Sequence, residues 1–196
     1  MKKDVLRAQF EKHGFSVSFF DSGKEAARYL AENIQGTSVA IGGSVTVQEM
    51  GLFPLLQEHN EVFWHWDVPG RETLKKARTA KIYVTGANAV SETGEIVNID
   101  GTGNRTSQML YGPEKLYVLV GSNKICPDLE SAVWRARNVA APKNAARLGV
   151  KTPCVAAGRC LDCDSPERIC HSMVITARPG NGMQAELVFI GEELGY

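Results

Sequence analysis

The sequence predicts a layered α/β fold with a largely parallel sheet and helices on both of its faces. Strand-like apolar runs alternate with helical segments over most of the chain, as in folds built from successive strand–helix units. Several of these runs are apolar throughout, which is typical of strands buried on both faces. The chain has 196 residues, of which 43% are hydrophobic and 22% charged, an ordinary composition for one globular domain.

The first half of the chain predicts four helices and four strands. The clearest helix has Ser22 as its N-cap, Glu25 three residues later, and Gly36 as its stop signal. The helix that follows Ser44 is expected to break near Pro54, because proline disrupts a helix interior. The expected helices cover residues 3–14, 21–36, 44–57 and 71–78, and the expected strands cover residues 15–20, 37–43, 61–66 and 80–86.

The second half begins with a hairpin or short strand at residues 95–99, between turn signals. A buried strand at 115–122 and a helix at 127–149 follow, with Pro142 as a boundary or kink. The apolar runs on either side of residues 179–182 suggest a terminal hairpin. We therefore expect one domain over residues 1–196, in which residues 150–196 form a cysteine-rich loop and that hairpin.

The charge balance excludes several classes of partner. Lys+Arg and Asp+Glu are equal at 22 each, so no global charge draws the chain to nucleic acid or to an anionic membrane. No apolar run follows the N-terminal lysines, and no stretch approaches the ~20 apolar residues of a membrane span. A cytoplasmic protein with reduced thiols is the expectation. His65 is expected to be an ordinary edge-strand residue.

Polar loops follow three of the predicted strands. Because parallel strands end at one edge of a sheet, where open α/β folds bind their ligands, these loops are expected to converge on a small anionic ligand. Glycines there let a ligand approach the backbone, and a following helix offers free N–H groups. A tight turn with Ser44 as N-cap explains the first loop equally well. The candidate ligand-binding residues are Gly42, Gly43, Ser44, Thr46, Asn98, Asp100, Asn104, Arg105, Asn123 and Lys124.

Four of the five cysteines, Cys154, Cys160, Cys163 and Cys170, lie in one short segment. Four thiolates suit an iron–sulfur cluster or tetrahedral zinc. A single C-x2-C pair in a compact run is closer to cluster ligation, although the spacing matches neither common ferredoxin pattern. The expected cofactor is therefore an iron–sulfur cluster, 4Fe–4S first, with zinc as the alternative. A redox disulfide and structural thiols without a ligand are the two other interpretations of these four cysteines. Arg159 and Arg168 would offset the thiolate charge, and Cys126 is a core or rim thiol.

Four stretches together resemble the lactate-utilisation (LUD) domain family, in a short single-domain form. They are GGSVTVQEMGL, VTGANAVSETGEIVNIDG, VGSNKICPDLESAVWRARNVAAP and TPC…GRCLDCDSPERIC. The resemblance implies a three-layer α/β/α fold related to the sugar-phosphate isomerase and CoA-transferase-like group. It also implies a role in bacterial oxidation of L-lactate to pyruvate, beside iron–sulfur partner proteins. The expected function is thus to bind a small organic acid or phosphate-bearing anion and to support lactate oxidation with a bound cluster. The sequence does not predict the oligomeric state, and a homo-oligomer is one option.

The turn Ser91-Glu92-Thr93-Gly94 resembles the SENG turn of CoA transferases, with Thr93 in place of asparagine. That resemblance implies a catalytic role for Glu92 as an acyl-accepting nucleophile. A solvated turn residue is the alternative for Glu92. Two other functions therefore stand beside the leading one: an acyl- or CoA-transferase-like enzyme, and a ligand-binding or regulatory module with structural zinc.

Overall fold

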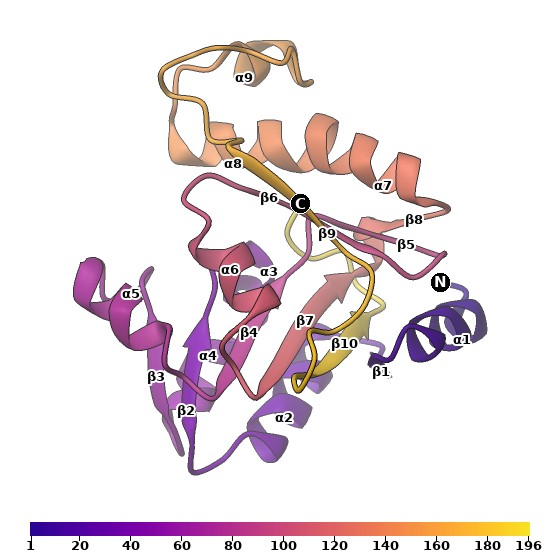
Figure 1. Ribbon diagram of the computed structural model, residues 1–196, viewed down its shortest axis with the longest axis vertical. Coiled ribbons are helices and arrows are strands. Elements are labelled where there is room, and N and C mark those ends of the chain that lie inside the picture. The colour runs from indigo at the N-terminus through magenta and orange to yellow at the C-terminus, as the bar shows by residue number, and fades with distance from the viewer.

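The computed structural model describes all 196 residues and has a six-stranded main sheet at its centre (Figure 1). Every strand pair in this sheet is parallel, which confirms the predicted fold class. Across the sheet the strands are β1 (Ser16–Phe20), β10 (Gln184–Ile190), β7 (Lys115–Gly121), β4 (Ile82–Gly86), β2 (Ser38–Ile41) and β3 (Glu61–Trp64).

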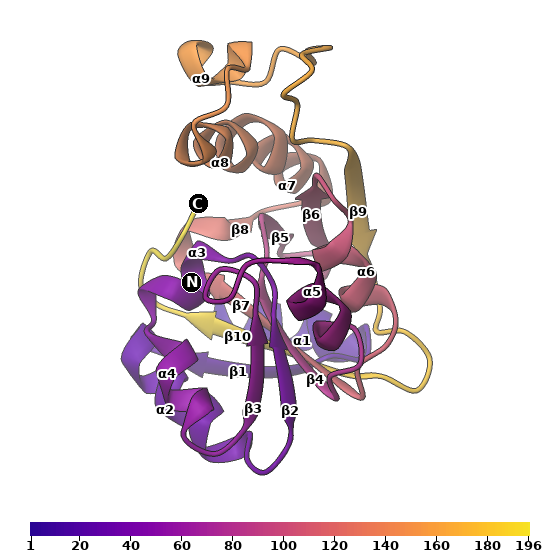
Figure 2. The same cartoon turned by 90° about the vertical axis from the view of Figure 1, so that its left-hand side faces the viewer.

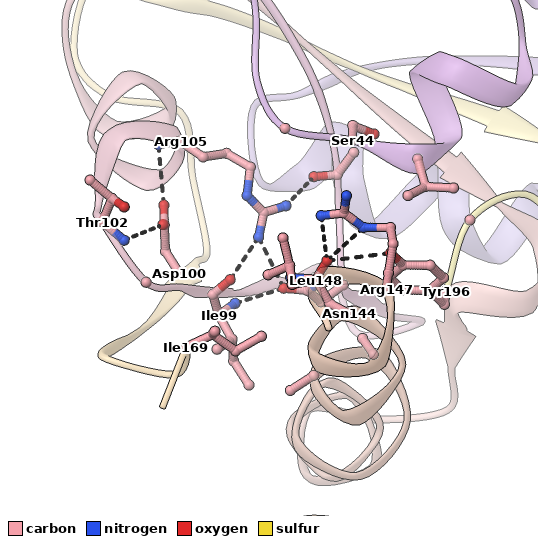
Figure 3. A pocket seen from close by; sticks show the side chains of 18 of the residues that line it. Ser44, Ile99, Asp100, Thr102, Arg105, Asn144, Arg147, Leu148, Ile169 and Tyr196 are labelled. Carbon is pink, nitrogen blue, oxygen red and sulfur yellow. Dashed lines mark hydrogen bonds between the residues drawn. The ribbon is translucent and has the colours of Figure 1, made fainter. Parts of the chain in front are cut away.

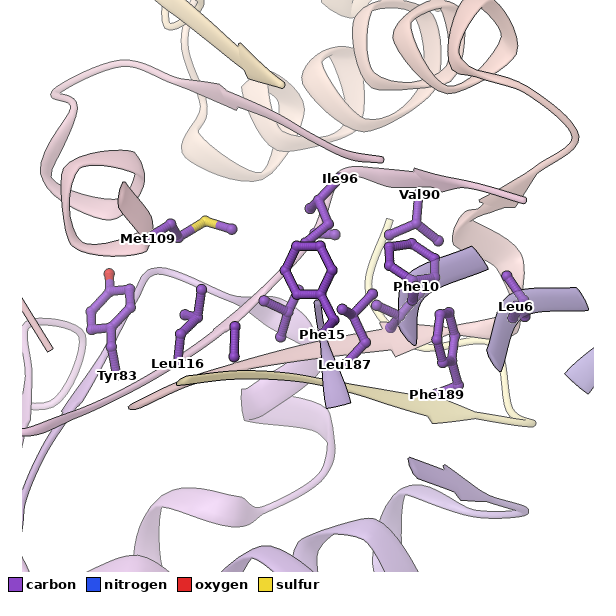
Figure 4. Close-up of a cluster of buried hydrophobic side chains, with 14 of the residues drawn as sticks. Leu6, Phe10, Phe15, Tyr83, Val90, Ile96, Met109, Leu116, Leu187 and Phe189 are labelled. Atoms are coloured by element: carbon purple, nitrogen blue, oxygen red, sulfur yellow. The ribbon is translucent and has the colours of Figure 1, made fainter. Parts of the chain in front are cut away.

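Helices cover both faces of the main sheet and make a three-layer α/β/α fold. On one face, α2 (Gly23–Asn33), α3 (Val45–Glu49) and α4 (Leu52–Gln57) enclose one hydrophobic cluster. On the other, α1 (Lys3–Lys12), α5 (Arg71–Ala77) and α6 (Asn104–Leu110) enclose a second, in which Phe10 packs against Phe189 at one end and Met109 lies beside Tyr83 at the other (Figure 4). None of the helices combines the length and hydrophobicity that crossing a membrane would need.

The first helices differ from expectation in one detail. Ser22 caps α2 as predicted, accepting the N–H of Glu25 at 3.2 Å. The break in the next helix falls at Gly51, which has a left-handed φ of 62°, and not at Pro54. Pro54 lies in the first turn of α4, where its missing N–H would have had no helical partner.

A second, four-stranded sheet lies beside the main one. Its strand order is β8 (Ile125–Cys126), β5 (Ala89–Ser91), β6 (Ile96–Asp100) and β9 (Ser172–Thr176). The predicted hairpin around residues 95–99 is confirmed, because β5 and β6 pair antiparallel. A helical rod packs on this sheet and consists of α7 (Leu129–Arg135), a π-helical turn (Ala136–Ala140) and α8 (Ala141–Leu148). The irregularity is that π turn, and Pro142 follows it in the first turn of α8.

The predicted terminal hairpin is wrong. β9 pairs antiparallel with β6 in the small sheet, whereas β10 lies between β1 and β7 in the main sheet. The burial patterns explain the separation. β9 alternates between exposed and less exposed residues, as an edge strand with one free face does, but β10 is buried along nearly its whole length. The connection between them therefore crosses from one sheet to the other.

The segment between α8 and β9 holds Cys154, Cys160, Cys163 and Cys170 and is called the cysteine segment. It forms the end of the molecule opposite the main sheet. It contains the short helix α9 (Pro153–Ala157) and then runs without regular structure to β9. Figure 2 shows the order of the layers: α9 and its loop lie beyond α8, α8 covers the small sheet, and the main sheet comes last.

Candidate functional site

A cavity of about 420 Å³ opens at the carboxyl edge of the main sheet (Figure 3). Its floor is formed by the loops that follow β2, β4 and β7, together with the loop between β6 and α6. Residues of α8, of the cysteine segment and of the C-terminal segment 195–196 form the opposite wall. The cavity therefore lies where open parallel sheets bind ligands, as the loops predicted.

Six of the ten predicted ligand-binding residues line this cavity: Gly43, Ser44, Asp100, Asn104, Arg105 and Lys124. The other four lie behind it and support it. Thr46 accepts a hydrogen bond from the Lys124 amine, and Asn98 Oδ1 accepts the N–H of Asn88. Asn123 holds the C-terminal segment through Leu194 and Gly195. A Cβ at Gly42 would lie 2.6 Å from the Tyr83 hydroxyl, so the close packing there excludes a side chain.

Asp100 organises the loop and does not offer its carboxylate freely. The carboxylate accepts the main-chain N–H groups of Thr102, Gly103, Arg105 and Thr106 at 2.9–3.1 Å, and the Thr106 hydroxyl at 3.1 Å. Burial raises the pKa of Asp100, but the hydrogen bonds from Thr106 and Gly103 and the charge of Arg105 outweigh that effect and leave the pKa below its usual value. Asp100 thus anchors the start of α6.

Arg105 is held at the cavity by three acceptors from neighbouring strands and loops. Its guanidinium donates to the carbonyl oxygens of Gly86 at 3.1 Å and Ile99 at 2.8 Å, and to Asn88 Oδ1 at 3.1 Å. These bonds fix the plane of the group, as Figure 3 shows. Because a guanidinium has five N–H donors, two are not used by these acceptors.

Lys124 lies on the cavity wall directly after β7 and is only 3% exposed. Its amine donates to Thr46 Oγ1 at 2.6 Å. Burial lowers the pKa of Lys124 to about 7, and the nearby charges of Arg135 and Arg105 lower it in the same direction. A large fraction of this amine is therefore uncharged at neutral pH.

The wall opposite the sheet was not predicted. Arg147 of α8 lies with its guanidinium carbon 4.6 Å from the centre of the Trp66 ring and donates to Asn144 Oδ1 at 2.8 Å. Tyr196 donates its hydroxyl to the same Asn144 oxygen at 3.3 Å.

His65 also lines the cavity, and burial lowers its pKa. His65 and Trp66 follow β3, so applying the strand-end rule to β3 would have found them. The residues on α8 carry no such local signal.

The cavity has an excess of positive charge. Arg105, Lys124, Arg147 and Arg168 line it, whereas Asp100 is the acidic side chain among its lining residues. Since the Asp100 carboxylate already accepts five hydrogen bonds, the side chains that remain to contact a ligand are mainly cationic donors.

Glu92 does not line the cavity. It lies in the turn between β5 and β6, where its carboxylate pairs with the Lys2 ammonium at 2.7 Å. Its main-chain N–H donates to the carbonyl oxygen of Cys126 at 2.7 Å. The turn that resembles the transferase motif is therefore separate from the cationic site.

The four cysteines of the C-terminal segment line one small cavity of about 20 Å³, together with Arg137 and Arg168. All of them are free thiols. No three His, Cys, Asp or Glu side chains are gathered closely enough to hold a single metal ion. The fifth cysteine, Cys126, is buried against the helical rod and is a core thiol.

Several donors already point at these sulfur atoms. Cys160 Sγ accepts the N–H of Asp162 at 3.4 Å and the Arg137 guanidinium at 3.8 Å. Cys154 Sγ lies 3.2 Å from the Thr152 hydroxyl. Arg137, and not the expected Arg159, thus contacts a sulfur atom.

Arg168 fixes the path of the segment. It donates to the carbonyl oxygens of Cys163 and Cys170, and it pairs with Asp162 at 3.2 Å, as Arg137 also does. The expected positive charge of Arg168 is therefore found beside the thiols.

The cysteine cavity and the cationic cavity adjoin. Ala141, Arg168 and Ile169 line both of them. The segment is also fixed to the loop after β6, since the N–H of His171 donates to the carbonyl oxygen of Asp100 at 3.0 Å. The loops that carry the anion-binding residues and the four-cysteine segment thus form one continuous region.

Comparisons with known proteins agree with this architecture. The sequence matches the family model of the LUD domain over residues 4–188. A crystal structure of a DUF162 family protein from Deinococcus radiodurans superposes with a TM-score of 0.57 at 15% identity, covering 97% of this chain and 99% of that one. The structure of eIF2B beta from Chaetomium thermophilum gives a TM-score of 0.32 at 16% identity, covering 65% of this chain and 44% of that one. No curated protein matches the chain significantly.

The family match spans nearly the whole chain and includes every strand of both sheets except the last residues of β10. At 15% identity, the Deinococcus structure supports the fold alone. The chain therefore belongs to the LUD-domain family, which is associated with lactate utilisation.

Proposed function

We propose that this LUD-domain protein binds a small organic acid or phosphate-bearing anion in the cavity at the carboxyl edge of its main sheet. The observation that supports this most directly is the charge of the lining: three guanidinium groups, those of Arg105, Arg147 and Arg168, line a site whose only acidic side chain is already saturated with hydrogen bonds. Arg105 and Arg147 carry planar groups suited to two-point contacts with a carboxylate or phosphate. The volume of about 420 Å³ suits a small molecule.

Calorimetric titration tests this proposal. L-lactate, pyruvate and inorganic phosphate are each titrated into the protein, with glycerol as an uncharged control of similar size. We expect saturable binding by at least one of the anions, weakened by added salt because screening reduces the attraction. If none of the three anions binds, or if glycerol binds as well as they do, the proposal is wrong.

We also propose that the neighbouring cysteine segment binds an iron–sulfur cluster, in which each iron would take one thiolate, so the four sulfur atoms need not converge on a single metal ion. Cys154, Cys160, Cys163 and Cys170 would be the ligands; the N–H of Asp162 and the Arg137 guanidinium already contact a sulfur atom, and such contacts tune cluster potentials. When bound, the cluster would supply one-electron transfer. The protein's role would then be to hold an organic acid near an electron carrier during L-lactate oxidation, beside iron–sulfur partner proteins.

Metal analysis of anaerobically purified protein distinguishes the two candidate centres. Iron and acid-labile sulfide with visible absorption would support the cluster, whereas stoichiometric zinc without a redox signal would favour a structural zinc module. The Cys160→Ser/Cys163→Ser variant should lose the centre, and Cys126→Ser is the matched control because that thiol lies in the core. Retention of iron by the double variant, or its absence from the reconstituted wild type, would contradict the cluster.

A further inference from the structure

One amine in the cavity lining, that of Lys124, has surroundings that favour a neutral group over a charged one. Lys124 is buried, yet none of the ion pairs in the structure includes it. Its hydrogen-bond partner is the neutral hydroxyl of Thr46, at 2.6 Å. A buried ammonium ion without a carboxylate partner is costly, so this environment favours the neutral amine.

The chain around Lys124 excludes water and fixes the amine. The Thr46 hydroxyl that accepts its N–H donates in turn to the carbonyl oxygen of Leu194 at 3.3 Å. Gly195 passes so close that a Cβ there would lie 3.0 Å from Nζ and 2.6 Å from Thr46 Oγ1. Gly195 is itself held by Glu49, which accepts its N–H at 2.6 Å. The amine is thus enclosed by Thr46 and the C-terminal segment, while the Lys124 residue forms part of the cavity lining.

Two neighbouring positive charges also lower the pKa of Lys124. The guanidinium groups of Arg135 and Arg105 repel a proton on Lys124, whereas Glu49 alone attracts one, and burial contributes most to the lowered pKa of about 7. At pH 7 the neutral fraction of this amine is then about a thousandfold greater than that of an exposed lysine. A neutral amine has a free lone pair and can act as a nucleophile.

We propose that the Lys124 amine forms an imine with the aldehyde or ketone carbonyl of a small carboxylate or phosphate bound in the cavity. This inference rests on the proposed anion binding and names the substrate class: an anion that carries a reactive carbonyl group. The cations of the cavity would hold the anionic end of the ligand and Lys124 would receive its carbonyl carbon.

The step needs no further reactant. The nitrogen lone pair forms a bond to the carbonyl carbon, and the C=O electron pair moves to oxygen, which takes a proton from nitrogen to give a carbinolamine. Loss of that hydroxyl with the second nitrogen proton releases water and leaves a C=N bond. Amine and carbonyl compound thus give imine and water, with no change in oxidation state. Thr46, which accepts the N–H, orients the amine and is a positioning residue.

Reductive trapping tests the inference on the wild-type protein. The protein is incubated at pH 7 with pyruvate or glyoxylate and sodium cyanoborohydride, and the modified lysine is found by peptide mass spectrometry. Propionate, which has the charge but no carbonyl, is the control. We expect one reduced adduct per chain, located at Lys124 and at least tenfold more abundant there than at any other lysine. Labelling distributed over exposed lysines would overturn the inference.

Calorimetry in parallel separates this inference from the proposed function. If pyruvate or glyoxylate binds but leaves no adduct at Lys124, imine formation is wrong and anion binding stands. If neither anion binds and no adduct forms, the imine inference is wrong, and the proposed function fails with it only if L-lactate and phosphate do not bind either.

Two variants complete the test. Lys124→Met removes the amine from its buried position and should lose the adduct completely. Thr46→Val should slow adduct formation several-fold and leave propionate affinity unchanged, an effect that a merely structural role would not produce. An adduct yield in Lys124→Met equal to that of the wild type would overturn the inference.

Discussion

The guanidinium group of Arg147 lies over the ring of Trp66, 4.6 Å from its centre, and this contact joins α8 to the end of β3 across the cavity. The two residues come from opposite walls, so the contact bridges the cavity. A cation over an aromatic ring contributes about 0.5–2 kcal/mol, more where water is excluded.

Arg147→Ala should weaken anion binding about tenfold, equivalent to about 1.4 kcal/mol, because it removes a planar cationic donor and its ring contact. Arg147→Lys should recover part of the loss, since it restores the charge but not the planar group. The matched control is Arg28→Ala, an exposed arginine on α2. Equal affinity in wild type and Arg147→Ala, measured by calorimetry, would remove Arg147 from the site.

Asp100→Asn should lower the free energy of unfolding by about 1–3 kcal/mol, because an amide cannot accept all five hydrogen bonds. The folded-state pKa of Asp100 is depressed, so the carboxylate stabilises the protein above its unfolded pKa of about 4 and loses that effect as the pH falls through the folded value. Urea unfolding from pH 7 down to 3 should therefore show a steeper acid loss in wild type than in Asp100→Asn. Asp67→Asn, at an exposed position, should match wild type.

Lys124→Met should stabilise the protein, and more strongly at pH 6 than at pH 10. The folded pKa of about 7 lies below the unfolded value of about 10.4, so the unfolded chain binds more protons between these values and wild-type stability rises with pH there. Below about pH 7 the folded state must bury a charged amine. We expect a melting temperature about 2–4 °C higher at pH 6, or about 1 kcal/mol. The exposed Lys143→Met serves as control, and a gain independent of pH would contradict the assignment.

Gly101→Ala should loosen the cysteine segment from the cavity. An added Cβ would lie 3.0 Å from the carbonyl oxygen of Ile169, which is backbone and cannot rotate away. We expect a loss of about 1–3 kcal/mol in stability and faster hydrogen exchange in residues 160–171. Exchange unchanged across those residues would show that the segment is held by its other contacts.

The strand pattern was enough to predict a parallel sheet, because several of its strands are continuously apolar and most are separated by recognisable helices. The terminal hairpin failed for a physical reason. A turn signal such as residues 179–182 shows that the chain changes direction, but it does not show which strand lies beside which. The contrast between the half-exposed β9 and the buried β10 was visible in the residues and favoured different sheets.

Local sequence rules predicted the part of the cavity lining that lies at the ends of strands. Loops after parallel strands converge whatever their sequence, so Ser44 and Lys124 were found from the ends of β2 and β7. Arg105 also reaches the cavity, but it follows β6, an antiparallel strand of the small sheet. Arg147 and Tyr196 come from elements that only the tertiary fold brings to that edge. Glu92 was selected for its turn, yet the fold pairs it with Lys2, the residue directly before α1. Hydrogen bonding also separates residues of one loop, as Asp100 and Arg105 show: the Asp100 carboxylate accepts five hydrogen bonds, whereas three of the five Arg105 donors have partners.

The insertion of β10 between β1 and β7 has a consequence for how the protein is made. β1 joins the main sheet only through β10, with Ser16 opposite Glu186, so β1 can pair only after residues 184–190 have been synthesised. Until then β1 has no neighbouring strand in the main sheet, and contacts of such long sequence separation form slowly. Because the four cysteines at 154–170 precede β10 in the chain, they are synthesised before the main sheet can close.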